Sequence, residues 1–226
     1  LQDLKLILFG SYTYNNSEDK QYLPTSVWAK GQAYRGSQRS EALLGNLMFT
    51  YNKRFNKHFI DLLGLGELSK ETYSGFHTTV TNFSSNALGY NNLQSGALRP
   101  WEGTGSYYDE PTLTSFLGRA NYAYDEKYIL TFNLRADASS KFGTNHKWGV
   151  FPSVSAAWNI TQEDFMKNLP IIDNLKLRVG YGTAGNLGGI DSYTTLALLR
   201  PNGIAPVGNS PIVTYEQMLN INPDLK

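Results

Sequence analysis

Alternation of apolar and polar residues constrains the fold of this chain more than any other feature. Between Tyr128 and Ala138, every second residue is apolar, and nearly all the residues between them are polar. Successive side chains of a β-strand point to opposite faces, so this pattern predicts a strand with one apolar and one polar face. Residues 116–124 alternate in the same way, and the short polar turn 125–127 predicts a hairpin.

If Tyr124 pairs with Tyr128, this hairpin packs well. The register brings small residues opposite large ones on the apolar face, which favours cross-strand contact. These pairs are Ala120 with Phe132 and Gly118 with Leu134.

Further alternating runs predict seven strands in all. They cover residues 4–14, 43–51, 58–69, 154–160 and 175–181. In the run 58–69, Ile60 and Leu62 compete with Leu63 and Leu65 for the apolar face, so its orientation stays open.

The expected connections alternate in length. Long ones are expected at 15–39, 70–112 and 186–226, and short ones at 53–57 and 125–127. This asymmetry is typical of outer-membrane barrels, which have short periplasmic turns and longer extracellular loops.

The compact connection 161–174 contains a helix start signal, because Asp164 follows Thr161 by three residues. We expect one short periplasmic helix over residues 162–168, closed by Pro170.

No apolar stretch approaches the roughly 18 residues that a membrane-spanning helix requires, and the mean hydropathy of -0.37 agrees. Strands of a membrane barrel need only about 9–11 residues each, so a barrel remains possible.

Aromatic residues, 13% of the chain, gather beside the expected short turns. Such rings are typical of a membrane–water boundary, although they are also simply good strand formers. The first row comprises Tyr51, Phe55, Phe59, Tyr122, Tyr124, Tyr128, Trp158 and Phe165, and a second row would comprise Tyr12, Tyr14, Phe142, Trp148 and Phe151.

Charge and composition exclude several classes of function. A net charge of +1 gives no electrostatic basis for binding nucleic acid. The chain has no Cys, and His58, His77 and His146 are far apart, so neither a metal site nor a catalytic site is expected. Glu163 and Asp164 are adjacent and favour a helix start rather than an acid–base pair. We therefore expect no enzyme and no cofactor.

Over residues 116–185 the chain strongly resembles the SusC/RagA family of TonB-linked outer-membrane transporters. The matching motifs are Arg119 to Tyr124, Leu134 to Gly143, Trp148 to Trp158, Glu163 to Met166, Leu175 to Gly182 and, near the end of the chain, Asn222 to Lys226. Two departures concern turn geometry: Ala138 replaces a usual Gly, and Ala184 makes the Thr183-to-Asn186 motif one residue longer.

The resemblance implies a large barrel with an N-terminal plug that imports glycans or peptides. It implies a SusD-like surface lipoprotein and TonB as partners, with TonB contacted through segments outside this chain, and a location in the bacterial outer membrane.

We therefore expect an all-β fold, an incomplete antiparallel up-and-down membrane β-barrel with long extracellular loops and one short periplasmic helix. Residues 1–226 would form a single partial barrel domain without the plug. An open sheet in lipid leaves unpaired backbone groups that each cost several kcal/mol, so the seven strands require others beside them.

Two sets of residues are candidates for function. Polar residues of the predicted strands would line the lumen: Arg119, Arg135, Asp137 and Arg178, together with Asn133 and Lys176. Aromatic residues of the long connections would contact ligand: Trp28, Tyr73, Trp101, Tyr107 and Tyr108. The lumen residues would equally suit an interior that faces a plug, and the rings would equally suit loop packing or docking of a lipoprotein.

Three classes of function remain open. The first is an energised nutrient transporter. The second is a passive porin or structural barrel, and the third is a soluble β-sandwich that binds ligands.

Overall fold

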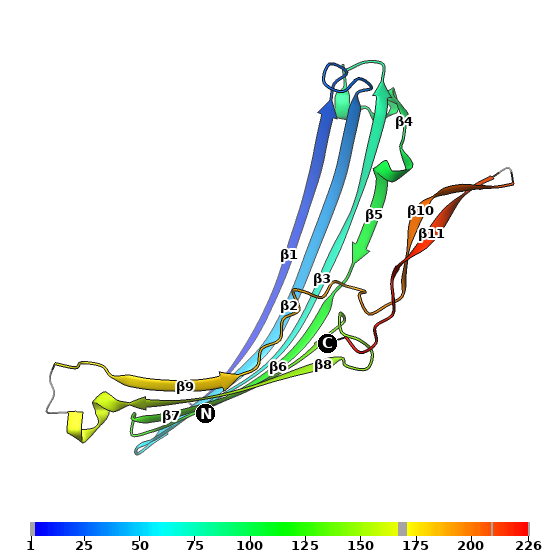
Figure 1. The fold of residues 1–226 in the computed structure, drawn as a ribbon. Helices are drawn as coiled ribbons and strands as arrows, with labels where there is room; N and C mark the ends of the chain where they lie inside the picture. The colour runs from blue at the N-terminus through cyan, green and yellow to red at the C-terminus, as the bar shows by residue number, and fades with distance from the viewer. Residues whose placement is uncertain (1–2, 167–170, 209, 226) are drawn as a thin grey trace.

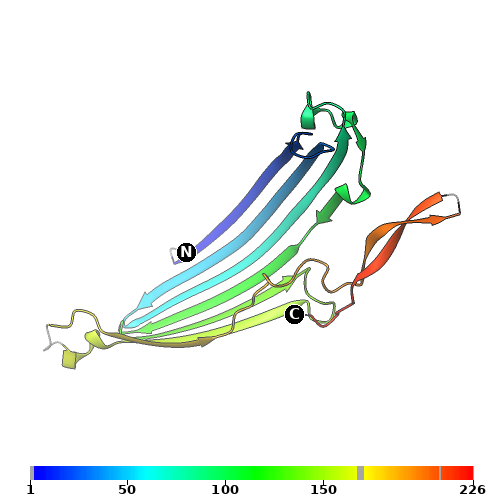
Figure 2. The same cartoon turned by 45° about the horizontal axis from the view of Figure 1, so that its top comes forward.

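The computed structural model describes residues 3–166, 171–208 and 210–225. In these residues, seven long antiparallel strands form one sheet in the order β1-β2-β3-β6-β7-β8-β9 (Figures 1 and 2). The strands are β1 (Leu4–Leu23), β2 (Gln32–Phe55), β3 (His58–Phe83), β6 (Thr112–Tyr124), β7 (Tyr128–Ser139), β8 (Trp148–Asn159) and β9 (Lys176–Gly182). The sheet is not closed, because β1 and β9 are its two outer strands. The expected up-and-down portion of a β-barrel is confirmed.

The hairpin register predicted from the sequence is confirmed. Tyr124 pairs with Tyr128, and the small residues face the large ones: Ala120 lies opposite Phe132 and Gly118 opposite Leu134. The turn requires left-handed backbone at two residues, with φ of 52° at Asp125 and 56° at Glu126. Asp accepts this geometry more readily than bulky residues do, which suits Asp125 to the first of these positions.

The open question about residues 58–69 is settled by pairing. Ile60 lies opposite Tyr122 and Leu62 opposite Ala120, so both share the apolar face of β6. Leu63 and Leu65 point to the polar face.

The long connection expected at 15–39 is wrong. β1 and β2 stay in register from Leu4 opposite Tyr51 to Leu23 opposite Gln32, which leaves only residues 24–31 between them. In residues 15–23 and 32–40, most side chains on both faces are polar. The alternation of apolar and polar residues that identifies a half-buried strand therefore disappears, although backbone hydrogen bonds between β1 and β2 continue.

The connection expected at 70–112 is largely strand as well. β3 continues to Phe83, and β4 (Gly96–Leu98) and β5 (Thr104–Asp109) pair with it on the way back. Three short 3-10 turns lie in the same segment: η1 (Gly89–Asn91), η2 (Leu93–Ser95) and η3 (Trp101–Gly103). β6 resumes beside β3 at Thr112, just after Pro111, which has no backbone N–H to donate to a ladder.

The different lengths of the strands divide the sheet into two regions. The short-turn end carries the turns after β2 and β6. The extended half comprises residues 15–23, 32–40 and 71–83 with β4 and β5, and rises beyond the other strands in Figure 1. Its tip has a small core of Ala33, Val80 and Phe83.

In the described part of residues 162–168, the one or two expected helical turns take the 3-10 form rather than the α form. That part holds two 3-10 turns, η4 (Ile160–Gln162) and η5 (Asp164–Met166). Residues 167–170 lie outside the described residues. A 3-10 turn is shorter than an α-helical turn, so it fits the short segment from Thr161 to Asp164.

The last long connection, expected at 186–226, contains a separate hairpin. β10 (Leu198–Val207) and β11 (Ser210–Leu219) pair with each other and with no other described strand. After it, the chain returns to the β7–β8 connection, where the Gly143 and Asn145 N–H groups donate to the carbonyls of Leu225 and Pro223. Two motifs far apart in sequence thus lie together.

Candidate functional site: the two faces of the sheet

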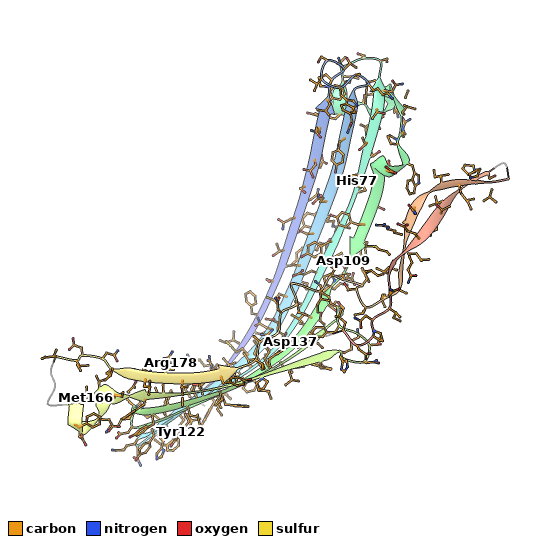
Figure 3. The ribbon with its side chains drawn as sticks, viewed as in Figure 1. His77, Asp109, Tyr122, Asp137, Met166 and Arg178 are labelled. Carbon is orange, nitrogen blue, oxygen red and sulfur yellow. The ribbon has the colours of Figure 1, made fainter. Side chains whose placement is uncertain are left out.

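The long sheet has one apolar and one polar face over the height of β6–β9. Leu130, Phe132 and Leu134 lie on one face, and Asn133 and Arg135 lie on the other, as their alternation predicts. Figure 3 shows Tyr122 and Arg178 near the short-turn end and His77 in the extended half.

The apolar face is not covered by a second layer in the described residues. Leu130, Phe132 and Leu134 keep 42–50% of their surface exposed. The face continues onto β1 through Leu6 and Leu8. A β-sandwich would bury these side chains between two sheets, so the soluble alternative does not fit this architecture.

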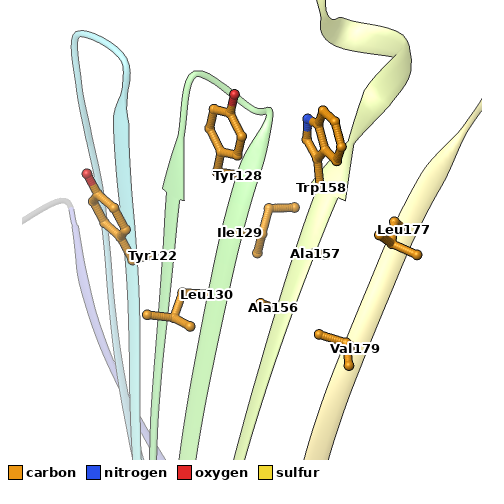
Figure 4. A pocket seen from close by; sticks show the side chains of 9 residues that line it. All are labelled: Tyr122, Tyr128, Ile129, Leu130, Ala156, Ala157, Trp158, Leu177 and Val179. Carbon is orange, nitrogen blue, oxygen red and sulfur yellow. The ribbon is translucent and has the colours of Figure 1, made fainter.

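A row of aromatic side chains crosses the apolar face at the short-turn end. Tyr128 pairs with Trp158, and Figure 4 shows their rings side by side with their polar tips toward the turn. A groove of about 440 Å³ lies beneath them, floored by Ala156. The Tyr122 hydroxyl lies 2.7 Å from His58 Nδ1. Amphipathic rings in this position are typical of a membrane–water boundary.

Glu163 holds this aromatic row to the connection that follows β8. Its carboxylate accepts hydrogen bonds from Trp158 Nε1 at 3.0 Å, the Tyr128 hydroxyl at 2.8 Å and Lys127 Nζ at 3.0 Å. These hydrogen bonds, with that from Trp158 first, lower the pKa of Glu163. The carboxylate therefore joins the turn, β8 and η4–η5 at one point.

A second aromatic row marks the other limit of the apolar band. The Trp148 ring stacks on Phe116, with centroids 6.0 Å apart, and Tyr12 and Tyr14 lie on the same face of β1. β8 has 12 residues. At about 3.3 Å per residue and a tilt of about 40°, a strand of this length covers roughly 30 Å, the thickness of a bilayer core.

Three rings expected in these rows lie elsewhere. Phe59 follows His58, which shares the face of Phe55, so Phe59 points to the polar face, where Arg54 lies 5.5 Å over its ring. Phe151 also faces the polar side, opposite Arg135. Phe142 is buried.

Apart from Arg54, a cluster of three cations lies on the polar face near the short-turn end. Arg119, Lys176 and Arg178 line one recess of about 310 Å³. No carboxylate in the described part of the chain forms an ion pair with them. Hydroxyl and amide groups complete the recess: Thr131 donates to Asn121 Oδ1, and Asn133 Nδ2 donates to Ser153 Oγ.

Arg135 and Asp137 form a second polar group, further from the short-turn end. Arg135 Nε donates to Asp137 Oδ2 at 2.8 Å, and its Nη2 donates to Ser115 Oγ at 3.0 Å. Asp137 is 8% exposed, while the Arg135 side chain is 39% exposed. Part of the guanidinium is therefore free to meet a group in the recess of about 620 Å³ that both residues line.

The structure separates the five rings that the sequence suggests as ligand contacts. Tyr73 and Tyr107 lie on the polar face of the extended half, on β3 and β5, whereas Tyr108 points to the opposite face. Trp28 lies in the connection between β1 and β2, and Trp101 lies in η3. Sequence analysis missed two residues near Tyr107, namely Tyr34 and His77, whose rings stack.

The described residues contain neither a membrane-spanning helix nor a cluster of metal ligands. Within them, no helix is long and apolar enough to cross a membrane. In the same ranges, no three His, Asp or Glu side chains come together as a metal site would require.

A sheet with an exposed apolar band between two aromatic rows, and a polar opposite face, defines the wall of a membrane β-barrel. Residues 2–226 match the family model of the TonB-dependent receptor-like β-barrel. The chain belongs to this family.

Individual relatives agree with this assignment. The chain is similar to TonB-dependent receptor P3 of Formosa agariphila, with 36% identity over 84% of this chain and 19% of that protein. It is also similar to TonB-dependent receptor SusC of Bacteroides thetaiotaomicron, with 39% identity over 41% of this chain and 9% of that protein. The resemblance to SusC/RagA transporters is confirmed, and the chain spans less than a fifth of these relatives.

A solved structure shows the same fold. The RagAB peptide transporter matches all of this chain and 25% of its own chain, with a TM-score of 0.85 and 22% identity. The long strands described above are therefore a barrel segment of known architecture.

Proposed function

We propose that this chain forms part of the barrel wall of a TonB-dependent importer in the bacterial outer membrane. The observation that carries this proposal is the separation of the two faces. Leu130, Phe132 and Leu134 would face lipid, and Arg119, Asn133 and Arg178 would face the channel. The names of the similar receptors support TonB as the source of energy.

The orientation follows from the connections. Barrels of this kind place short turns in the periplasm and long segments outside the cell. The short-turn end would then be periplasmic, and the extended half and the β10–β11 hairpin would be extracellular.

Substrate and partners are part of the proposal. Similarity to SusC and to the RagAB peptide transporter supports import of glycans or peptides together with a SusD-like surface lipoprotein. TonB itself would be contacted by segments outside this chain. The relatives are named as receptors, which supports a protein that is not an enzyme.

We infer that the channel-facing cations meet anionic groups, either on a substrate or on a plug. Arg119, Lys176 and Arg178 have no ion pair among the described residues, and an unpaired cation cluster attracts negative charge. Arg135 is partly neutralised by Asp137 and would contribute mainly hydrogen-bond donors.

Energised uptake distinguishes this function from that of a passive porin. The complete transporter should accumulate its substrate in cells with TonB, and deletion of TonB should abolish the accumulation. Uptake that persists at the same rate without TonB would support the porin and contradict the importer.

A further inference from the structure

The polar face of the extended half carries a strip of aromatic rings that the proposed function leaves unassigned. Tyr34, Tyr73, His77 and Tyr107, here called the ring strip, all lie on this face. The odd-numbered residues of β3 define it: Leu63 lies opposite Arg119, and in the same phase Tyr73 lies opposite Asp109 and His77 opposite Gly105.

Glycines lie under three of these rings. A Cβ added to Gly36 would lie 2.8 Å from the Tyr34 hydroxyl, and one added to Gly75 would lie 2.7 Å from the Tyr107 ring. A Cβ at Gly105 would lie 2.8 Å from the His77 ring. Since no side chain stands beneath them, these rings lie down on the backbone of the sheet.

The result is a low aromatic surface on which Tyr107 is exposed and Tyr34 and His77 are half-buried. Tyr34 and His77 stack with centroids 6.1 Å apart and an angle of 22° between their planes. Tyr107 keeps 49% of its surface exposed. The negative face of an aromatic ring attracts polarised hydrogen atoms, including the C–H groups on the flat side of a sugar ring.

Charge distinguishes the two faces of this half. Its strand cations Lys20, Arg35 and Arg39, and Lys70 directly below it, all point to the side opposite the ring strip. Each pairs there with a carboxylate: Lys20 and Arg35 with Glu18, Arg39 with Glu41, and Lys70 with Glu110.

The ring-strip side instead carries carboxylates and neutral polar groups. Asp19, Glu71 and Asp109 lie on this side, and Gln38 and Ser40 lie beside Gly75 and Tyr73. An anionic ligand would find no Lys or Arg from these strands to pair with. Amide and hydroxyl groups suit the hydroxyls of a neutral ligand.

Charge disfavours a short peptide as the occupant. Of the three strands that carry the strip, β2 and β3 are paired on both sides, and among the described strands only β5, which pairs with β3 alone, offers an edge for strand addition. The terminal carboxylate of a short peptide would lack a cation. A chain of neutral sugar rings needs neither a free strand edge nor a cation.

We propose that Tyr34, His77 and Tyr107 form a stacking platform for the pyranose rings of a neutral oligosaccharide. The inference rests on the proposed importer, and it names the class of substrate that the extracellular half would bind before import. Gln38 and Ser40 would exchange hydrogen bonds with the sugar hydroxyls.

The test begins with the complete transporter in detergent. It is presented with an array of neutral glucan, mannan and xylan oligosaccharides, uronate-bearing and sulfated oligosaccharides, and short peptides. We expect binding to at least one neutral oligosaccharide, which then serves as the probe for calorimetric titration. Binding confined to acidic oligosaccharides or to peptides, or no binding to any neutral member, overturns the proposal.

Matched variants assign that binding to the strip. Tyr107→Ala should weaken binding of the neutral probe roughly tenfold, the scale of one stacked ring. Gly105→Ala keeps every ring but displaces His77, because the added Cβ would lie 2.8 Å from His77 Cε1, and it should weaken binding about threefold or more. Phe76→Ala, which removes an exposed ring from β3 between Gly75 and His77 but on the opposite face, is the control and should leave affinity unchanged.

Equal effects of Tyr107→Ala and Phe76→Ala, or none from Tyr107→Ala and Gly105→Ala, would overturn the platform. A heat-induced shift in gel mobility checks that each variant forms a folded barrel. The proposed function fails separately: if wild-type uptake does not need TonB, the importer is wrong, whatever the array binds.

Discussion

At the residue scale, Glu163 has more structural partners than any other side chain at the short-turn end described above. It accepts hydrogen bonds from an indole, a phenol and an ammonium group, each from a different position around the turn. Its side chain is only 14% exposed. Loss of one acceptor would leave three donors with weaker partners, and unmade hydrogen bonds near a low-dielectric boundary are costly.

The variant Glu163→Gln should therefore lower the thermal unfolding midpoint of the complete transporter at pH 7. The pKa of Glu163 is lowered in the fold, so its stabilisation is present above the ordinary carboxyl pKa. This stabilisation is lost as the pH falls through the lowered pKa, and the difference between wild type and variant should then disappear.

Glu126→Gln is a suitable control, because its exposed pair with Arg54 contributes little. A midpoint difference that is as large in acid as at pH 7, or equal for both variants, would contradict this role of Glu163.

At the scale of elements, alternation predicts a strand only where its two faces meet different surroundings. This held for β6, β7, β8 and β9, where even the Tyr124–Tyr128 register was correct. It failed in the extended half, where neighbouring residues such as Gln38 and Arg39 are both polar although they point to opposite faces. It also failed for β10 and β11, because Pro201, Pro206 and Pro211 argue against strands unless these are edge strands.

The same reasoning explains which site residues could be predicted. Arg119 and Arg178 each lie in a strand that the sequence predicts, so the face on which each lies follows from its position in the alternation. The contact between Tyr34 and His77 depends on the register of two segments expected to be loops, so the sequence held no sign of it.

Opposite faces of one strand should respond differently to charge. Phe132→Lys places an ammonium group on the lipid side of β7, and should lower the free energy of unfolding by about 2–4 kcal/mol if it lies near the bilayer midplane. Asn133→Lys, the adjacent residue on the polar face, should cost much less. Urea titration of the folded barrel fraction measures both, and a larger loss from Asn133→Lys would reverse the assigned faces.

At the scale of the whole molecule, an apolar band is bounded by Trp148 on one side and Trp158 on the other, and the extended half rises beyond it. The polar face changes character along this height. Near the short-turn end it carries Arg119, Lys176 and Arg178, which form no ion pair within the described residues. The Arg135–Asp137 pair lies above them, and aromatic rings lie over glycine in the extended half. Within the part of the chain that the structure describes, the outer strands β1 and β9 each have one unpaired ladder edge, which a membrane tolerates only when other strands pair with it.

The most direct test of the two-faced wall measures the accessibility of spin labels in the complete transporter in lipid. The chain has no Cys, so labels at Phe132→Cys and Asn133→Cys are specific in a background without other cysteines. The account predicts that the label at residue 132 collides more with oxygen dissolved in the bilayer and less with a water-soluble nickel chelate than the label at residue 133. The opposite order, with residue 132 in water and residue 133 against hydrocarbon, would contradict the assignment of this sheet to a transporter barrel.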